Sequence, residues 1–201
     1  MQRDYQKELD LLIEKIKENK MKPALLLHSC CAPCSSYVLK YLLSFFNITV
    51  FYYNPNTFPE EEYNKRKFEL EKLLSLMGVE KSVKLICSEY DHETFNRATK
   101  DFINEKEGGH RCSICYELRL QRTAELAKKL GVDYFCTTLS VSPYKNAQKL
   151  NNIGQKLAAE YGVNYLVSDF KKKAGYKQSI ELSKKYNLYR QNYCGCKPPS
   201  A

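Results

Sequence analysis

The chain has 201 residues, 43% of them hydrophobic and 12% aromatic, which is enough to bury the core of one domain and excludes a disordered protein. Its formal net charge is +9, which favours a polyanionic partner such as a nucleic acid, although many basic proteins bind none. No apolar run approaches the roughly 20 residues of a membrane-spanning helix, and the charged N-terminal segment does not resemble a signal peptide. We therefore expect a cytoplasmic protein without a membrane partner.

Segments with the pattern of buried strands alternate with segments that carry a helical stripe of apolar side chains. The first helical stripe covers residues 5–19, and Lys22-Pro23 ends it. Strand patterns follow at residues 24–27, 48–53, 83–87, 133–138 and 163–167. The remaining helices are expected to begin near Ser35, Pro59, Asp91, Cys112 and Ser142, and after the basic segment 171–177.

Capping residues indicate where several of these helices start and stop. Ser35 is predicted to cap a helix that runs through Phe46. Ser142-Pro143 is predicted to open a helix that runs through Glu160, and Gly162 is predicted to end it.

This alternation predicts an α/β fold, a Rossmann-like three-layer sandwich with a mostly parallel sheet of about five strands. We expect a single domain, 1–201, with an N-terminal helix in 1–20 and with the basic segment, the last helix and a Cys-Gly-Cys tail in 168–201. Ligands of such folds bind beyond the carboxyl ends of the strands. The loops that follow the first, fourth and fifth strands are therefore expected to face one crevice.

Nine cysteines are grouped in a way that suits a metal or redox site better than a disulfide framework, which is rare in a reducing compartment. Three groups lie far apart in the sequence, and two lone cysteines fall in strand patterns, where a buried thiol behaves as a small apolar side chain. The groups are Cys30, Cys31 and Cys34 after the first strand, Cys112 and Cys115, and Cys194 and Cys196, and the lone residues are Cys87 and Cys136.

The pair Cys112-Ser-Ile-Cys115 opens a helix, where the helix dipole favours thiolates, and is by itself half of a metal site or a redox pair. Joined to Cys30 and Cys31, or to Cys34, it provides the four thiolates that zinc or a 4Fe-4S cluster requires. The mouth of a parallel sheet is a functional position rather than a structural one. We therefore favour a cluster over zinc, and zinc over no metal.

Three further features each allow two interpretations. The thiols of Cys194-Gly-Cys196 are too close in sequence to chelate a metal alone. Either they form a strained, easily reduced disulfide, or they are tail cysteines without a role. His28 either orients a ligand or, the stronger interpretation, closes the first strand as a hydrogen-bonded residue. The basic run 171–177 is either a solvated face or, with its neighbours Phe170 and Tyr176, a contact for phosphates.

Several segments combine with the cysteine groups into one specific pattern: His28–Cys34, Tyr53–Asn56, Arg111–Leu120, Thr137–Lys145, Asp169–Tyr176 and Leu188–Cys196. Together they resemble the QueH family of epoxyqueuosine reductases, and only the first twenty residues lie outside the resemblance. The resemblance implies a cobalamin-independent enzyme of the last step of queuosine biosynthesis, in which epoxyqueuosine in the tRNA anticodon loses its epoxide oxygen. The implied fold is similar to PP-loop and adenine-nucleotide α-hydrolase-like folds.

The resemblance also implies roles for the cysteines. Cys194 and Cys196 would be a redox-active pair, and Cys34 a further catalytic thiol that could ligate a second mononuclear metal ion, iron or zinc. The residues alone leave open which four thiols bind the cluster. The implied partners are the anticodon stem-loop of tRNA and an electron donor that the sequence does not identify. By motif position, the 4Fe-4S ligands would be Cys30, Cys31, Cys112 and Cys115.

The chemistry of the implied reaction sets further requirements. Conversion of an epoxide into an alkene takes two electrons and two protons and releases water. A metal near Cys34 or an acid must therefore neutralise the charge of the departing oxygen. The candidate proton donors are Tyr144, Asp169 and Tyr189.

Two other functions compete with this one. A PP-loop tRNA thiolase requires a glycine-containing phosphate loop after the first strand, and His28–Cys34 contains no glycine. A non-enzymatic RNA-binding module with structural zinc explains the charge and four of the cysteines. It leaves Cys34, Cys194 and Cys196 without a role.

Overall fold

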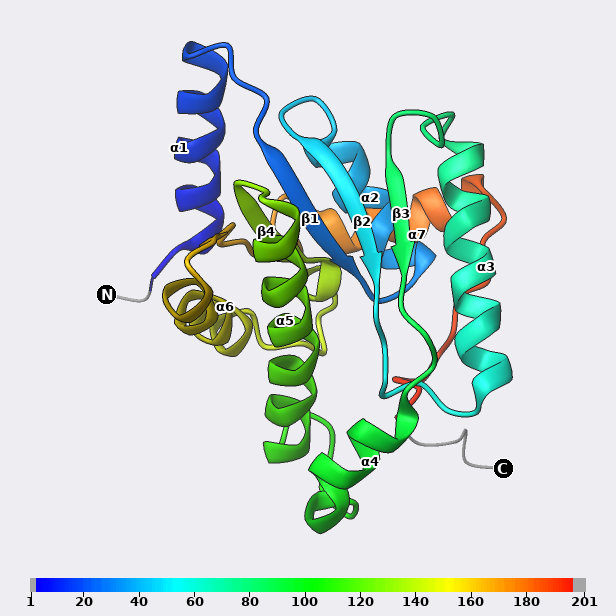
Figure 1. The fold of residues 1–201 in the computed structure, drawn as a ribbon. Helices are drawn as coiled ribbons and strands as arrows, with labels where there is room; N and C mark the ends of the chain where they lie inside the picture. The colour runs from blue at the N-terminus through cyan, green and yellow to red at the C-terminus, as the bar shows by residue number, and fades with distance from the viewer. Residues whose placement is uncertain (1–2, 197–201) are drawn as a thin grey trace.

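Five parallel strands form the central sheet in the computed structural model, which describes residues 3–196 (Figure 1). The strand order is β3-β2-β1-β4-β5, and every neighbouring pair is parallel. This confirms the predicted α/β fold with a parallel five-stranded sheet. The strands are β1 (Ala24–Ser29), β2 (Asn47–Tyr52), β3 (Lys84–Cys87), β4 (Tyr134–Thr137) and β5 (Asn164–Tyr165).

Helices cover both faces of the sheet, with α5 and α6 on one face and α1, α2, α3 and α7 on the other (Figure 1). A short helix, α4, packs against α5 near the carboxyl ends of the strands. The helices are α1 (Tyr5–Glu18), α2 (Ala32–Leu42), α3 (Glu60–Leu76), α4 (His92–Thr99), α5 (His110–Leu130), α6 (Ala147–Tyr161) and α7 (Gly175–Lys185), with 3-10 turns at Lys100–Phe102 and Thr138–Val141.

The central strand β1 divides two hydrophobic cores. Successive side chains of a strand point to opposite faces, so Leu25 and Leu27 pack against α1 and α2, whereas Leu26 packs against α5 and α6. All three leucines are fully buried. A strand covered on both faces is continuously apolar, which is why the run Ala24–Leu27 is readable from the sequence.

The strand order changes direction between β1 and β4. From β1 the chain builds β2 and β3 outward on one side, and then returns to place β4 and β5 on the other. His28 at the end of β1 is paired in register with Thr137 at the end of β4. The loops that leave these two strands diverge there, and such a point is where open parallel sheets bind ligands.

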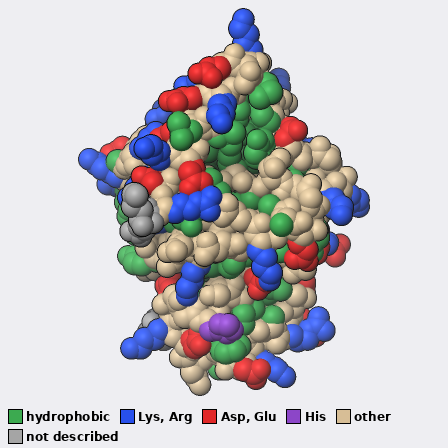
Figure 2. All heavy atoms as spheres, turned by 90° about the vertical axis from the view of Figure 1, so that its left-hand side faces the viewer, with side chains coloured by type: hydrophobic (Ala, Val, Ile, Leu, Met, Phe, Trp, Pro, Cys, Tyr) green, Lys and Arg blue, Asp and Glu red, His purple; other side chains and the backbone are tan. Residues whose placement is uncertain are grey.

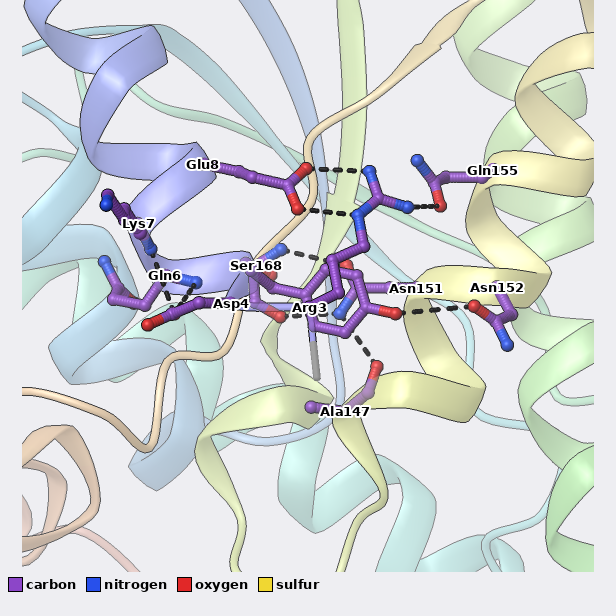
Figure 3. A network of polar contacts seen from close by, with 11 residues as sticks. Arg3, Asp4, Gln6, Lys7, Glu8, Ala147, Asn151, Asn152, Gln155 and Ser168 are labelled. Carbon is purple, nitrogen blue, oxygen red and sulfur yellow. Dashed lines mark hydrogen bonds and ion pairs between the residues drawn. The ribbon is translucent and has the colours of Figure 1, made fainter. Parts of the chain in front are cut away.

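Polar contacts anchor the first helix to α6 (Figure 3). Asp4 caps α1, because its carboxylate accepts hydrogen bonds from the amides of Gln6 and Lys7. Arg3 forms an ion pair with Glu8 and also donates a hydrogen bond of 2.8 Å to Gln155 of α6. The N-terminal helix is thereby fixed to the layer on the opposite face.

A second contact in Figure 3 fixes the segment that follows β5. The buried amide of Asn151 donates to the carbonyl oxygens of Ala147 and Ser168, and its oxygen accepts from the Ser168 amide at 2.9 Å. The chain therefore leaves the sheet early. The predicted strand 163–167 is wrong in length, since only Asn164–Tyr165 pair with β4.

Two predicted helix starts are also wrong. Helix α2 begins at Ala32 and ends at Leu42, because Pro33 fits the first turn of a helix and Ser35 lies inside it with its hydroxyl bonded to Cys31. Helix α6 begins at Ala147, where Asn146 rather than Ser142 caps it through the Lys149 amide. The segment before α6 is instead a 3-10 turn, Thr138–Val141.

The molecular surface carries charges of both signs. On the face with α1 and α6, Lys and Arg side chains alternate with Asp and Glu, so this face is not uniformly basic (Figure 2). Among residues 3–196, no helix is both long and apolar enough to cross a membrane. The predicted segments 1–20 and 168–201 extend, at residues 1–2 and 197–201, outside the described part of the chain.

Candidate active site

Three thiols meet at the junction between β1 and α2. The sulfur atoms of Cys30, Cys31 and Cys34 all lie within 4.8 Å of one another, and those of Cys30 and Cys31 are 3.7 Å apart. Two thiolates on one tetrahedral ion, each bonded at ~2.3 Å, would be ~3.8 Å apart. The loop therefore presents soft ligands at a spacing that suits metal binding.

Backbone and hydroxyl contacts fix this loop. The Ser35 hydroxyl donates to the Cys31 carbonyl oxygen at 2.8 Å and lies 2.6 Å from the Ser29 hydroxyl. The Thr138 hydroxyl accepts from the Cys30 amide at 3.2 Å and donates to the Cys30 sulfur at 3.4 Å. These partners come from β1, α2 and the segment after β4, so the fold itself determines the positions of the three sulfurs.

The three thiols differ in acidity. Hydrogen bonds from Cys30 and Cys34, and a weaker one from Gln191, hold the pKa of Cys31 well below its usual value, against the opposing effect of burial. The contact with Cys30, then that with Cys31 and burial, raise the pKa of Cys34. Cys31 is therefore the most acidic thiol of the three, and a thiolate is the form that ligates metals.

Cys112 and Cys115 occupy the first two turns of α5, as predicted. The Cys112 sulfur accepts the Gly108 amide at 3.2 Å, and Cys115 is buried, with Arg119 donating to its sulfur at 3.7 Å. Neither thiol belongs to the group of three sulfurs within 4.8 Å. The Cys34 sulfur is thus closer to the sulfurs of Cys30 and Cys31 than the sulfurs of the C-x-x-C pair are.

The buried guanidinium of Arg119 connects the two halves of the site. Besides Cys115, it contacts the Asn54 side-chain oxygen and, at 3.3 Å, the His28 ring. Burial raises the pKa of Cys115, and the positive charge of Arg119 opposes that rise. The same charge acts on Cys30, from the other half of the site. The charge of Arg119 therefore acts on one thiol of the β1–α2 loop and on one of α5.

His28 has the hydrogen-bonded position predicted for it. Its ring nitrogens lie 2.8 Å from the Thr137 hydroxyl and 3.0 Å from the Tyr53 carbonyl oxygen. Burial, followed by the charge of Arg119, lowers the pKa of His28 to about 3. The ring is therefore neutral at pH 7, and it ties together the ends of β1, β2 and β4.

The Cys-Gly-Cys tail is held by side chains from two helices. The Cys194 carbonyl oxygen accepts from Arg66 of α3 at 3.2 Å, and that of Cys196 accepts from Arg111 of α5 at 2.9 Å. The Phe58 amide binds the carbonyl oxygen between them at 2.9 Å. All nine cysteines, including this pair, are free thiols in the structure.

The two tail thiols have opposite acidities. A hydrogen bond from Cys196, and then the positive charge of Lys145, lower the pKa of Cys194 to about 5, although burial acts in the other direction. The contact with Cys194 and burial raise the pKa of Cys196. The Lys145 ammonium lies 3.4 Å from the Cys194 sulfur.

A cleft of about 550 Å³ opens at the carboxyl ends of the strands, where the sequence predicts the ligand site. Sulfurs from both ends of the chain line it, since Cys30, Cys31 and Cys34 face it together with Cys194. Cys112, Cys115 and Cys196 are not part of its lining. Its charged lining residues are Arg66, Arg119, Lys145, Arg190 and Glu107.

Comparison with known proteins agrees with this arrangement. A family model described as epoxyqueuosine reductase QueH matches residues 25–198. The chain belongs to this family. A QueH protein of Staphylococcus epidermidis is 42% identical over 197 residues, which cover 96% of this chain and 83% of the relative. QueH proteins of Streptococcus pyogenes serotype M1 and Thermotoga maritima are each 37% identical, covering 96% and 85% of this chain and 76% and 87% of the relatives.

Only one of the three predicted proton donors faces the cleft of this QueH chain. Tyr144 lines it and is 71% exposed. Asp169 is paired with Lys171 at 2.7 Å outside the lining. The Tyr189 hydroxyl donates to Glu62, and its pKa is raised to about 12 by burial and by that carboxylate.

The basic run 171–177 contributes less to the cleft than its sequence suggests. Lys171 pairs with Asp169, and Lys173 pairs with Asp10 of α1 at 2.6 Å. From this run, Tyr176 lines the cleft, with the Arg190 guanidinium 5.5 Å from its ring centre.

Sequence reasoning missed the buried cations that organise the site. Arg119 stands one helical turn after Cys115, a spacing that could have indicated a contact with its sulfur. Lys145 lies within a motif quoted for the family resemblance but had no role assigned. Arg66 and Arg111 reach the tail across 128 and 85 residues of sequence, and no local pattern indicates that contact.

Proposed function

We propose that this protein reduces epoxyqueuosine to queuosine in tRNA, the activity that the names of its relatives state. The observation that carries the proposal is the cleft itself, in which thiols of the β1–α2 loop and of the tail face one cavity. A reductive reaction needs reducing groups beside the substrate, and these sulfurs provide them. The cleft is also large enough for a nucleoside to enter, given typical ligand sites of about 300–1,000 Å³.

The tail thiols can balance the reaction. When Cys194 and Cys196 form a disulfide, they lose two electrons. The epoxide takes up two electrons and two protons, both of its bonds to oxygen break, a carbon–carbon double bond forms, and the oxygen leaves as water. An external electron donor must then reduce the disulfide for the next turnover. We propose that this reversible change, rather than metal binding, is the role of the pair.

The thiols of the β1–α2 loop and of α5 suit an iron–sulfur centre. We propose that four of them, from the β1–α2 loop and from α5, hold a 4Fe-4S cluster, with Arg119 between the two pairs. When bound, such a cluster supplies electrons one at a time. Cys34, which lies nearer to the loop thiols than the α5 pair does, would then be free for catalysis or for a second ion, iron or zinc. The proposed cluster ligands are Cys30, Cys31, Cys112 and Cys115.

The cleft is suited to a tRNA loop. Its lining has four cationic side chains and one anionic side chain, Glu107, and phosphates dominate the affinity of proteins for nucleic acids. Three tyrosines also line it, namely Tyr144, Tyr176 and Tyr193, and unstacked RNA bases stack on aromatic rings. We propose that one catalytic domain binds the anticodon stem-loop here, in the cytoplasm, where tRNA and reduced thiols occur together.

The two competing functions have less support. A PP-loop thiolase would need a glycine-containing loop after β1. That position holds a cysteine loop without glycine, in which Cys31 is the residue directly before α2. A purely structural zinc site would not explain why Cys194 faces the same cleft as the loop thiols.

Anaerobic purification with iron and sulfide analysis, followed by an assay on tRNA that carries epoxyqueuosine, tests the proposal. We expect about four iron and four sulfide per chain, and queuosine by mass spectrometry when a strong reductant is added. A fully loaded protein that yields no queuosine would refute the function. A colourless protein with one zinc and no sulfide would refute the cluster.

A pair of variants tests the ligand set. Cys112→Ser should lose iron and sulfide, whereas Cys34→Ser should retain the sulfide content of the wild type. The reverse result would show that Cys34, and not the α5 pair, completes the cluster.

A further inference from the structure

Lys145 places a buried ammonium group against the tail. Its side chain is only 10% exposed and lies in the short segment between the 3-10 turn and α6. It pairs with the Glu107 carboxylate and donates to the Cys194 sulfur at 3.4 Å. Among the four cations that line the cleft, it is the one with a hydrogen bond to a tail sulfur within the described residues.

The tail presents its two thiols unequally. The Cys194 sulfur meets Lys145, and Cys194 lines the cleft, whereas Cys196 does not. Arg111 holds the Cys196 backbone on the other side, through its carbonyl oxygen. A dithiol with one residue in the lining of a cleft and the other outside that lining has the arrangement of an attacking and a resolving thiol.

We propose that Lys145 is a positioning residue that holds the Cys194 sulfur in the cleft as the substrate-facing thiolate and leaves Cys196 to close the disulfide. This inference rests on the redox role proposed above for the tail. It states which of the two thiols faces the substrate, and it names Lys145 as the residue that determines this.

Charge balance supports this assignment. A buried ammonium needs anionic partners, and Glu107, whose side chain is 48% exposed, supplies only one of them. Burial lowers the pKa of Lys145, but the Cys194 thiolate and Glu107 together raise this pKa by more, so the ammonium keeps its charge. The groups that act on the Cys194 thiol are Cys196, Lys145, Arg119 and Glu107.

The redox step is balanced with this order. The sulfur–sulfur bond forms between the Cys194 thiolate and the Cys196 thiol, which together lose two electrons. Cys196 releases one proton, and the solvent returns the proton that Cys194 released to it when it became a thiolate, so that two protons are available. The substrate takes up both electrons and both protons as its oxygen leaves as water.

Site-resolved alkylation tests the proposal without using turnover as its readout. The reduced, cluster-loaded protein is treated at pH 7 with limiting iodoacetamide and digested with trypsin. One tryptic peptide, which begins at Gln191 and includes the uncleaved Lys197-Pro198 bond, contains both thiols, and fragment ions distinguish them. We expect at least tenfold more label on Cys194 than on Cys196. Lys145→Met should reduce the Cys194 labelling rate at least tenfold, and Lys145→Arg should restore part of it.

Two further variants serve as controls. Lys149→Met removes an exposed lysine whose ammonium donates to the Gly108 carbonyl oxygen, outside the cleft, and should leave the labelling unchanged. Glu107→Gln removes the other anionic partner of Lys145 while keeping the lysine, and should preserve the preference for Cys194. This variant also covers the case in which Lys145→Met does not fold, because loss of the preference in Glu107→Gln would then overturn the assignment.

The outcomes separate this inference from the proposed function. Equal labelling of the two thiols in the wild type, or unchanged labelling in a folded Lys145→Met protein, would overturn the role of Lys145. If the labelling follows the expectation but Cys194→Ser still turns over normally, the pairing stands and the redox role of the tail is wrong.

Discussion

The thiols of the β1–α2 loop and the thiols of the tail are held in different ways. Cys30, Cys31 and Cys34 stand where a buried strand passes directly into a helix, and backbone atoms and short hydroxyls fix their loop, with Gln191 beside Cys31. Cys194 and Cys196 stand in irregular chain, and long side chains from α3 and α5 hold their carbonyl oxygens.

This difference agrees with the roles proposed above for the two groups. A metal centre needs ligands that stay fixed, since outer contacts that orient them tune its affinity. A dithiol that becomes a disulfide must change the distance between its sulfurs, which a tail outside any helix or strand permits. The loop is thus suited to hold a cofactor, and the tail to alternate between two states.

The largest effect is expected from Cys31→Ser in the rigid group. It removes the most acidic thiol of that group, so iron content and turnover should both fall below a few per cent of wild type. Iron analysis and the epoxyqueuosine assay measure this. Cys87→Ser, at a half-buried position in β3, is the matched control and should retain its iron. Full iron content in Cys31→Ser would break the distinction between the two groups.

Cys194→Ser should separate reaction from binding. The serine hydroxyl cannot form the disulfide, so turnover should fall at least a hundredfold, while the cluster absorbance and iron content stay at wild-type values. An equal loss of iron would mean that the tail also ligates the metal, and the comparison drawn above would fail.

Gly195→Ala should have an intermediate effect. Gly195 has φ +94°, and an added Cβ would come within 3.0 Å of the Arg66 guanidinium. Gly108 has φ +93° with nothing within 4 Å of such a Cβ, so Gly108→Ala imposes the same backbone strain without the contact. We expect turnover to fall about tenfold in Gly195→Ala and less in Gly108→Ala, at constant iron content. Equal losses of turnover in the two variants would show that the contact between the tail and Arg66 does not affect turnover.

The smallest effect is expected at Cys136, a thiol in neither group. It is fully buried in β4, and burial raises its pKa to about 12. Cys136→Ala should leave iron and turnover unchanged and lower the free energy of unfolding by about 1 kcal/mol, a typical cost for a point mutation. Urea denaturation measures this cost. A loss of iron would place this core thiol among the ligands.

The sheet and several helix ends were predictable because their signals are local. The apolar run before His28 marks a strand covered on both faces, and Gly131 and Gly162 end α5 and α6 in the left-handed conformation that suits glycine. Ser35 was misleading, because a serine near a helix start resembles a cap, whereas Pro33 had already placed the first turn earlier.

The site was predictable only in part, for a physical reason. Parallel strands bring their carboxyl ends together, so the approach of the Cys30 loop to Thr138 follows from topology. The contacts of Lys145 and Arg66 with the tail depend on how long side chains from other segments pack, and no periodic pattern encodes that. How far the C-x-x-C pair lies from the loop thiols also depends on the packing of separate segments, so the sequence does not predict it.

The pairing of β1 with β4 has a consequence for how the protein is made. The hydroxyl that holds Cys30 belongs to Thr138, 108 residues later in the chain, and domains generally fold as units during synthesis. While the ribosome is still adding the second half, the cysteine loop has no partner strand on that side and no α5 above it. Three neighbouring thiols are then exposed to oxidation and to stray metals. We therefore expect the metal proposed for this site to be inserted only after β4 has docked.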